Sequence, residues 1–315
     1  MRAGGPDLDG GLGIAGPREL DDVRRFSHEA MATVFEVYAV HPDERYAAQA
    51  AQAAFDLVDR LERDLSRFRS NSDITRVNSL AAGENASVGP STIECLVIAR
   101  HLFDLTGGAF DISIGTGLPS LELDADDFVV RATKEGVQVD LGGIGKGYAV
   151  DLVAELLEEW GIERALVHGG FSSVLALEAP AGRDGWPLTL SDPAAPSRVL
   201  ARFSVRQTAL GASGVRKGDH IVDPRTGAPV RGRLAAWVAL PRPARTRADA
   251  PADDGPRIAA GAVTDALTTA FMLLSAEAIA ALCERSPGLE AWVLPEHAGR
   301  QPDEAELLHF GRPAE

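Results

Sequence analysis

The pattern of hydrophobic and polar residues predicts a strand followed by a long helix near the N-terminus. Residues 32–40 alternate between apolar and polar types and are rich in β-branched and aromatic side chains, which is typical of a strand. Residues 43–68 carry charged residues between large apolar side chains that recur at helical spacing. The recurring apolar residues are Leu57, Val58, Leu61, Leu65 and Phe68.

Further along the chain, helices and short strands are interspersed. A second helix is expected over 91–105, with Ser91 as its N-cap and Gly107 and Gly108 ending it. Helices are also expected over 146–160 and 265–283, and short strands over 136–140, 164–168, 174–177, 188–190, 200–205 and 235–240. Because many strands follow one another directly between 164 and 240, the pattern favours an α+β fold over a regular doubly wound sheet.

The composition divides the chain into a tail and one folded domain. Residues 1–25 are rich in Gly, Pro and Asp and are expected to form a flexible tail, with the folded domain over 26–315. Within that domain, residues from about 241 to 258 contain four prolines and many charges, which indicates an exposed, mobile insertion.

Charge and composition exclude several classes of protein. Hydrophobic residues make up 45% of the chain and charged residues 24%, so wholesale disorder is not expected. The net charge of −15 argues against nucleic acid or an anionic membrane as a partner, and any anionic ligand needs a local cation, metal or helix N-terminus. The two cysteines give no disulfide framework. Neither a signal peptide, a cysteine for lipidation nor a membrane-spanning stretch is apparent, so a cytoplasmic protein without a membrane anchor is expected.

Two segments combine glycines with polar residues. In Val137–Asp151 a predicted strand ends at Asp140, a glycine-rich turn follows, and a helix opens near Lys146, an arrangement that suits a phosphate. The spacing fits neither the P-loop nor the dinucleotide-binding fingerprint, and the glycines could serve the turn alone. In Thr106–Ile114, the glycines, Phe110 and Asp111 could hold a ring or a ribose, or could simply end a helix.

Two further segments contain candidate catalytic and metal-binding residues. His220 and Asp223 lie three residues apart just before a turn, with Ser213 shortly upstream, although such a pair is also common as a structural feature. Asp265 and Thr269 are separated by one helical turn, so their oxygen atoms lie on one face. Carboxylate, hydroxyl and carbonyl oxygens are the ligands that Mg²⁺ accepts, while the alternative is an ordinary helix cap.

Taken together and in this order, these segments resemble the ApbE family, the FAD:protein FMN transferases. The matching stretches are Met31-Ala-Thr-Val-Phe-Glu, Leu65-Ser-Arg-Phe through Asn78, Gly108-Ala-Phe-Asp, Asp140 to Asp151, Ala165-Leu-Val-His-Gly-Gly, His220-Ile-Val-Asp-Pro-Arg-Thr-Gly and Thr264-Asp-Ala-Leu-Thr-Thr-Ala. The resemblance implies an α+β fold with mixed or antiparallel sheets, packed helices, and an active site between two lobes. It also implies an enzyme that binds FAD and Mg²⁺, transfers FMN to a Ser or Thr of an acceptor protein, and releases AMP.

Carried over by position, the resemblance assigns a role to each motif residue. Met31, Ala109, Phe110, Asp111, Asp140, Lys146, Ser213 and Ile221 are implied to contact FAD. Asp265 and Thr269 are implied to bind the metal with a backbone carbonyl from the glycine turn, for which we expect Gly143. His220 and Asp223 correspond to the catalytic pair, and which of them is the base stays open.

One departure from the family pattern affects the expected activity. After Gly169 and Gly170 the family usually has Asn or Asp, whereas this chain has Phe171, Ser172 and Ser173. Two alternatives to the transferase stand: an FAD pyrophosphatase that releases FMN and AMP with water in place of the acceptor hydroxyl, and a flavin-binding protein without catalysis, which this departure motivates. Retention of the catalytic pair and the metal pair argues against the second.

Overall fold

The computed structural model describes residues 12–14, 22–215, 221–243, 259–296 and 307–311. Their largest element is an eight-stranded sheet in which every neighbouring pair of strands is antiparallel. In spatial order its strands are β14 (Leu308–Phe310), β13 (Glu290–Pro295), β12 (Arg233–Pro241), β11 (Thr208–Gly214), β8 (Ser173–Ala176), β7 (Ala165–Gly169), β3 (Thr33–Val40) and β2 (Val23–Ala30). This sheet separates two hydrophobic cores.

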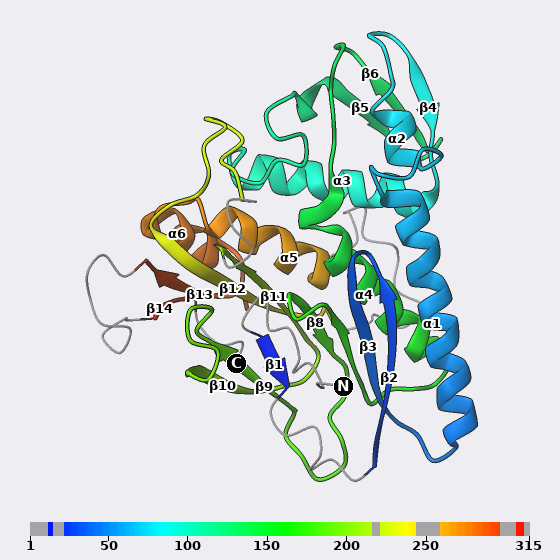
Figure 1. The fold of residues 1–315 in the computed structure, drawn as a ribbon, viewed down its shortest axis with the longest axis vertical. Helices are drawn as coiled ribbons and strands as arrows, with labels where there is room; N and C mark the ends of the chain where they lie inside the picture. The colour runs from blue at the N-terminus through cyan, green and yellow to red at the C-terminus, as the bar shows by residue number, and fades with distance from the viewer. Residues whose placement is uncertain (1–11, 15–21, 216–220, 244–258, 297–306, 312–315) are drawn as a thin grey trace, which may run out of the picture.

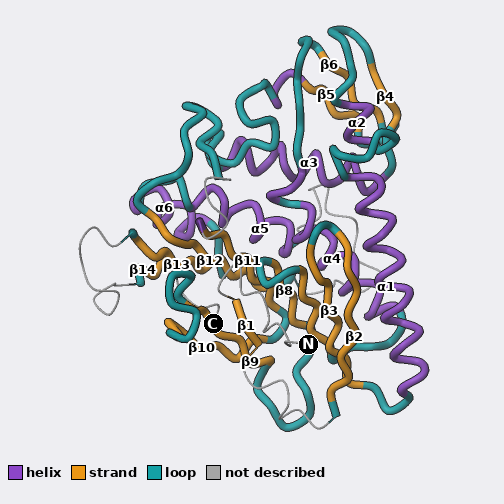
Figure 2. The backbone as a smooth tube through the Cα atoms, in the orientation of Figure 1, coloured by secondary structure: helices purple, strands orange, loops and turns teal. Residues whose placement is uncertain are grey.

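Helices cover one face of this sheet, as Figures 1 and 2 show. They are α1 (Glu44–Leu65), α4 (Gly145–Glu159), α5 (Ala260–Phe271) and α6 (Ala276–Arg285), and α3 (Pro90–Leu105) packs against α5 and α1. Successive strand residues point to opposite faces, so Phe35 and Val37 of β3 pack against the helices whereas Tyr38 packs on the other side. The helices and this face form the larger core.

A smaller sheet covers the opposite face. It consists of β1 (Leu12–Ile14), β9 (Trp186–Ser191) and β10 (Val199–Val205). Trp186 and Leu188 of β9 pack against Leu210 and Trp237 of the large sheet, and all four side chains are almost completely buried. The large sheet is therefore the middle of three layers.

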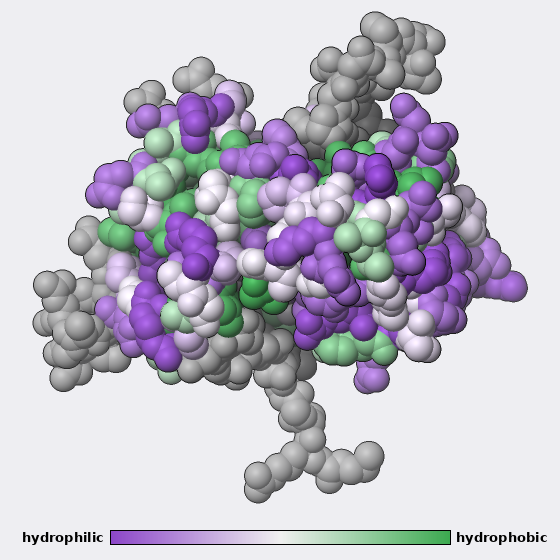
Figure 3. All heavy atoms as spheres, turned by 90° about the horizontal axis from the view of Figure 1, so that it is seen from above, coloured by the Kyte–Doolittle hydropathy of each residue, from purple (hydrophilic) through white to green (hydrophobic). Residues whose placement is uncertain are grey.

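A third, three-stranded sheet lies at the end of the molecule beyond α3 (Figure 1). It contains β4 (Asn85–Ser87), β5 (Leu121–Asp124) and β6 (Val129–Ala132), next to the short helix α2 (Asp73–Val77) and the 3-10 turn η2 (Leu118–Ser120). Seen from this end, hydrophilic side chains cover most of the visible surface and hydrophobic residues form small separate groups (Figure 3).

The structure confirms the expected α+β class with antiparallel sheets. It confirms most predicted elements, but residues 136–140 do not form the expected strand. The side chain of Asn78 takes the place of a neighbouring strand there: its Oδ1 accepts a hydrogen bond from Val139 N at 2.7 Å, and its Nδ2 donates to Val139 O at 3.0 Å. An alternating sequence pattern alone does not show whether the backbone N–H and C=O groups are hydrogen-bonded to a neighbouring strand or to a side chain.

Three other predictions need correction. The single helix expected over 265–283 is two helices, because Ser275 caps a new helix with a hydrogen bond from Ala278 N to its Oγ at 3.2 Å. The cap of α3 is Gly89 rather than Ser91. The tail prediction is wrong for residues 12–14, which form β1 and bury Leu12 in the second core, and for residues 23–25, which begin β2 and pair with β3.

The expected insertion from about 241 to 258 lies mostly outside the described residues, although Pro241 ends β12. Both cysteines, Cys95 on α3 and Cys283 on α6, are buried and unpaired with each other. Within the described ranges, every helix is too short or too polar to cross a bilayer.

The buried His168 gives the fold a testable dependence on pH. Burial lowers the pKa of His168 to about 4, although the nearby Glu36 opposes this effect and Arg25 adds to it. In the unfolded chain its pKa is about 6.5. At a pH between these two pKa values, His168 binds a proton in the unfolded state but not in the folded state. This residue therefore destabilises the fold as the pH falls from about 6.5 towards 4.

We therefore expect the free energy of unfolding to fall more steeply between pH 7 and pH 5 in the wild type than in His168→Gln. Urea denaturation at both pH values measures this difference. Parallel pH dependence of the two proteins would contradict the assignment.

Candidate active site

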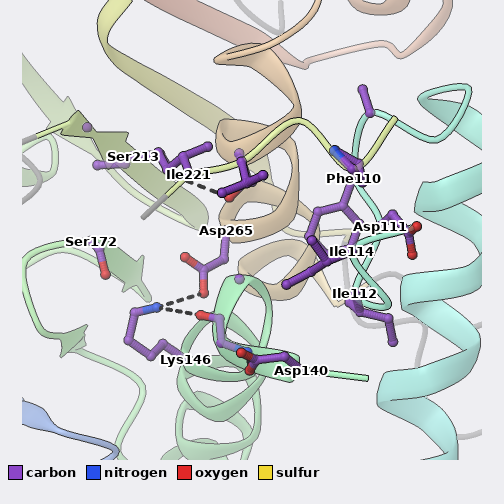
Figure 4. Close-up of a pocket in the computed structure, with 18 of the residues that line it drawn as sticks. Phe110, Asp111, Ile112, Ile114, Asp140, Lys146, Ser172, Ser213, Ile221 and Asp265 are labelled. Carbon is purple, nitrogen blue, oxygen red and sulfur yellow. Dashed lines mark hydrogen bonds and ion pairs between the residues drawn. The ribbon is translucent and has the colours of Figure 1, made fainter. Parts of the chain in front are cut away.

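A cavity of about 430 Å³ opens where the ends of β7, β8 and β11 meet α4, α5 and the loop that follows α3. Figure 4 shows its side chains converging from these separate elements. Its walls come from the large sheet and α5 and from the segment that follows α3. Its lining residues include Ala109, Phe110, Asp111, Asp140, Gly143, Lys146, Ser213, Ile221, Asp265 and Thr269, which the sequence analysis names.

Helices α4 and α5 cross at backbone contact beneath this cavity. A Cβ added to Gly147 would lie 2.1 Å from the carbonyl oxygen of Gly261 and 2.7 Å from the Cβ of Asp265, so only glycine fits there. This close approach lets the N–H of Gly147 donate a hydrogen bond to Asp265 Oδ2 at 3.0 Å. The first turn of α4 therefore positions a carboxylate carried by α5.

A second contact fixes the start of α5. The N-cap residue Ala259 provides no side-chain hydrogen bond. Instead, the buried carboxylate of Asp151 on α4 accepts hydrogen bonds from Gly261 N at 2.8 Å and Ala262 N at 2.9 Å. An anionic group at this position satisfies two unpaired amides and interacts favourably with the helix dipole. Together, Asp151 and Gly147 hold α5 against α4 at two points.

Asp265 is only 3% exposed, and its carboxylate already faces a positive charge. The ammonium group of Lys146 lies 3.4 Å from Asp265 Oδ2 and 3.2 Å from the carbonyl oxygen of Gly142 (Figure 4). Asp265 lines the cavity, and its Oδ1 takes part in no hydrogen bond within the described part of the chain. This leaves one carboxylate oxygen available for a cation.

The other expected metal ligands lie beside it. A Cβ added to Gly143 would lie 3.6 Å from Thr269 Oγ1, so the glycine turn and the hydroxyl are close neighbours. Among the described residues, no three His, Cys, Asp or Glu side chains form a metal-binding cluster. A cation here would therefore rely on one carboxylate together with neutral oxygens. This donor set fits Mg²⁺ when substrate phosphates complete its coordination.

Met31 belongs to a neighbouring, smaller cavity of about 210 Å³. The two cavities share Asp140, Gly142 and Lys146 in their walls. Phe68, whose side chain is 82% exposed, also lines the smaller cavity. The expected FAD contacts therefore fall in two adjoining compartments, which suits an elongated ligand.

Two of the expected contact residues use their carboxylates to shape loops. Asp111 Oδ1 accepts hydrogen bonds from the N–H and hydroxyl of Ser113 at 2.8 and 2.7 Å, and Oδ2 accepts one from Gly115 N at 2.9 Å. Asp140 accepts a hydrogen bond from Gly142 N at 2.9 Å and pairs with Arg67 at 3.2 Å. These bonds set the conformation of the segments that line the cavity.

The expected catalytic pair is only partly visible. His220 lies outside the described residues. Asp223 is absent from the residues that line the cavity, and its carboxylate forms two side-chain hydrogen bonds with Arg225, at 2.9 and 2.8 Å. These bonds lower the pKa of Asp223 below its usual value. Its backbone oxygen also accepts hydrogen bonds from Thr226 N and Gly227 N, so Asp223 organises the turn. Its catalytic role stays a prediction.

The segment that departs from the family pattern forms the turn between β7 and β8. Gly170 and Phe171 both have positive φ angles, of 65° and 54°. Asn and Asp tolerate this left-handed conformation better than most residues, which explains a preference for them at position 171. Phe171 instead packs edge-on against His168, with ring centroids 4.3 Å apart. Ser172 lines the cavity.

Comparison with known proteins decides the family. The model of the ApbE family matches residues 31–119 and 115–253. The chain belongs to the ApbE family. A curated relative from Treponema pallidum, named FAD:protein FMN transferase, is 27% identical over 310 residues, covering 82% of this chain and 81% of the relative. A protein of the same name from Vibrio cholerae is 24% identical over 275 residues, covering 74% of this chain and 81% of its own.

Solved ApbE structures share the fold. The flavin transferase ApbE from Vibrio cholerae aligns with a TM-score of 0.73 and 19% identity, covering 91% of this chain and 97% of that one. The apo form of the flavinyl transferase ApbE from Pseudomonas stutzeri aligns with a TM-score of 0.73 and 22% identity, covering 91% and 94%.

Three residues that build this ApbE site have no role assigned from the sequence. Gly147 and Asp151 lie one helical turn apart on the side of α4 that faces α5, and this spacing was visible in the sequence. Ser172 was singled out only as part of the segment that departs from the family pattern, because its access to the cavity depends on the left-handed turn before it.

The crossing of α4 and α5 leads to a paired prediction. Gly147→Ala places a methyl group against the backbone of α5 and should destabilise the protein by about 1–3 kcal/mol. Gly145→Ala is the matched control in the same helical turn, because its added Cβ would meet nothing closer than Leu141 Cβ at 4.0 Å. Chemical denaturation compares the two; equal stability would show that the close helix contact is unimportant.

Proposed function

We propose that this chain is a FAD:protein FMN transferase, which cleaves the pyrophosphate of FAD, attaches FMN to a Ser or Thr of an acceptor protein and releases AMP. Membership of the ApbE family and the names of its relatives support this proposal. The single observation that carries it is one cavity that brings Lys146, Asp265 and Thr269 to the glycine-rich start of α4.

The proposed step is a phosphoryl transfer. The hydroxyl oxygen of the acceptor forms a bond to the phosphorus of the FMN half, and the bond from that phosphorus to the oxygen shared with AMP breaks. The hydroxyl proton leaves to a base, and AMP departs with the bonding electron pair. Catalysis of this kind depends on positioning and on stabilising charge on the phosphoryl oxygens.

Lys146 is the cation that the chain itself supplies for this charge. Its ammonium group is held at the cavity wall by Asp265 and by the carbonyl oxygen of Gly142. In a protein with a net charge of −15, such a local cation favours the binding of an anionic substrate. The N-terminal turn of α4, where Lys146 lies, adds a favourable dipole.

We propose that Asp265 Oδ1, Thr269 Oγ1 and a backbone carbonyl at Gly143 hold Mg²⁺ with the substrate phosphates. When bound, Mg²⁺ supplies positive charge that offsets the negative charge developing on the phosphoryl oxygens. Asp265 can serve because Gly147 N–H and Lys146 already satisfy its other oxygen.

For the base, the contacts of Asp223 favour His220. The Asp223 carboxylate is committed to Arg225, which lowers its pKa and makes it a weaker proton acceptor. In this proposal Asp223 sets the turn that follows His220, and His220 takes the proton of the acceptor hydroxyl.

Mass spectrometry tests the transferase directly. The protein is incubated with FAD, MgCl₂ and an acceptor domain that carries a flavinylation Ser or Thr, with an EDTA control. We expect the acceptor mass to increase by one FMN and AMP to be released, both only in the presence of metal. Free FMN with an unmodified acceptor would support a pyrophosphatase instead. Unchanged FAD would support a flavin-binding protein.

His220→Ala should lower kcat by roughly 10²- to 10⁴-fold, the range typical of a removed general base. The dissociation constant for FAD should stay within about threefold of the wild type, because proton removal contributes to turnover rather than binding. Steady-state kinetics and FAD fluorescence titration measure both quantities. An equal loss of turnover and affinity would make His220 a binding residue.

Asp265→Asn should abolish metal-dependent transfer while the circular dichroism spectrum stays unchanged. The amide can still accept the hydrogen bond from Gly147 N but removes the negative charge that a cation requires. Asp223→Asn, which changes a carboxylate outside the cavity lining, is the control for metal affinity. Equal metal affinity in all three proteins would remove Asp265 from the metal site.

A further inference from the structure

Ser213 lies at the junction between the large sheet and the residues that we propose to hold the metal. It is near the end of β11, on the strand face that packs against α5. Its Oγ is 2.8 Å from Thr268 Oγ1 and 3.5 Å from Thr269 Oγ1, and Ser213 lines the cavity (Figure 4). The Ser213 hydroxyl therefore contacts the buried Thr268 on one side and borders the cavity on the other.

Close packing of β11 on α5 fixes this position. A Cβ added to Gly211 would lie 2.5 Å from the carbonyl oxygen of Thr264, so the strand touches the helix backbone there. Two residues along the strand and one turn along the helix, Ser213 meets Thr268. Two residues of a strand and one turn of a helix span similar distances, so β11 and α5 stay in register at this point.

Counting the hydroxyl protons of Ser213 and Thr268 shows which of the two donates the hydrogen bond between them. Thr268 is fully buried, and its hydroxyl donates to the carbonyl oxygen of Asp265 at 2.7 Å, which can only accept. Because Thr268 has a single hydroxyl proton, it cannot also donate to Ser213. Ser213 must therefore be the donor in its 2.8 Å contact with Thr268.

This assignment leaves Ser213 Oγ with lone pairs, but no proton, for the cavity. A phosphate oxygen at neutral pH requires a hydrogen-bond donor, so it is a poor partner for Ser213 in this state. A divalent cation is a suitable partner, since hydroxyl oxygens are among the hard ligands that it accepts. Thr269, whose hydroxyl lies 3.5 Å from Ser213 Oγ, and Asp265 line the same cavity.

We propose that Ser213 Oγ is a direct ligand of the divalent cation, in addition to Asp265, Thr269 and the carbonyl at Gly143. This inference rests on the proposed function, because it deepens the metal site of that reaction. It replaces the FAD contact expected for Ser213 from the family resemblance. It also gives the cation one more protein oxygen in a region with a single carboxylate among its proposed ligands.

The first test measures binding of Mn²⁺ without turnover. Free Mn²⁺ is followed by electron paramagnetic resonance as MnCl₂ is titrated into wild type, Ser213→Ala and Thr268→Val, each saturated with FAD in the absence of acceptor, with FAD alone as the blank. We expect Ser213→Ala to weaken Mn²⁺ binding by about tenfold or more, as loss of a contact at a metal site typically does. Thr268→Val, which removes the hydrogen-bond partner but keeps Ser213, should change the dissociation constant by less than about threefold.

The second test changes the chemistry of the ligand. Ser213→Cys places sulfur at the same position, and soft thiolate ligands favour Cd²⁺ over Mg²⁺ or Mn²⁺. Competition of CdCl₂ against Mn²⁺ should therefore shift towards Cd²⁺ by at least about tenfold in Ser213→Cys. No such shift is expected in Ser213→Ala or Thr268→Val.

Three results would overturn the proposal. The first is Mn²⁺ affinity in Ser213→Ala equal to that of the wild type. The second is an equal loss in Ser213→Ala and Thr268→Val without a Cd²⁺ shift in Ser213→Cys, which would give Ser213 only a structural role. The third is absence of Mn²⁺ binding by the wild type, which would remove the cation site. The acceptor-mass experiment on the wild type tests the transferase activity separately. Failure of the Ser213 proposal can therefore be distinguished from failure of the proposed function.

Discussion

The contact between α4 and α5 is the constraint on which the candidate active site depends. Gly147 and Gly261 allow the two helix backbones to touch, and Asp151 anchors the first amides of α5. This crossing places the N–H of Gly147 and the ammonium of Lys146 against Asp265. One turn later, α5 presents Thr268 and Thr269 to Ser213 of β11. A small separation of the helices would therefore disturb the carboxylate, the lysine and the hydroxyl group together.

The strongly acidic character of the chain contrasts with how few carboxylates remain for a cation. Asp111 holds its own loop, Asp140 caps the glycine turn and pairs with Arg67, and Asp223 binds Arg225. Each of these carboxylates shapes a segment of the cavity wall or its border. Asp265 differs because one oxygen is satisfied by α4 and the other takes part in no hydrogen bond within the described residues. The site thus concentrates its metal-binding capacity in one carboxylate and several neutral oxygens.

The sequence was sufficient to predict the fold class, most of the helices and the residues that gather at the cavity, because these follow from hydrophobic spacing and from family motifs. It was insufficient where tertiary contacts replace local patterns. Asn78 satisfies the backbone at Val139 from a distant part of the chain, so the alternating residues before Asp140 form no strand. Ser275 divides a continuous apolar run into two helices. The proton arrangement around Ser213 depends on Thr268 and on the carbonyl of Asp265, and no sequence pattern indicates such an arrangement.

Anomalous diffraction tests the central claim, that the crossing of α4 and α5 builds a single cation site beside the FAD pyrophosphate. Crystals of the protein grown with FAD and MnCl₂ would be measured at the manganese absorption edge. We expect one strong anomalous peak in the cavity, within ligand distance of Asp265, Thr269, Ser213 and a carbonyl of the glycine turn, and adjoining the phosphates. A peak elsewhere, or bound FAD with no peak between α5 and the start of α4, would contradict it.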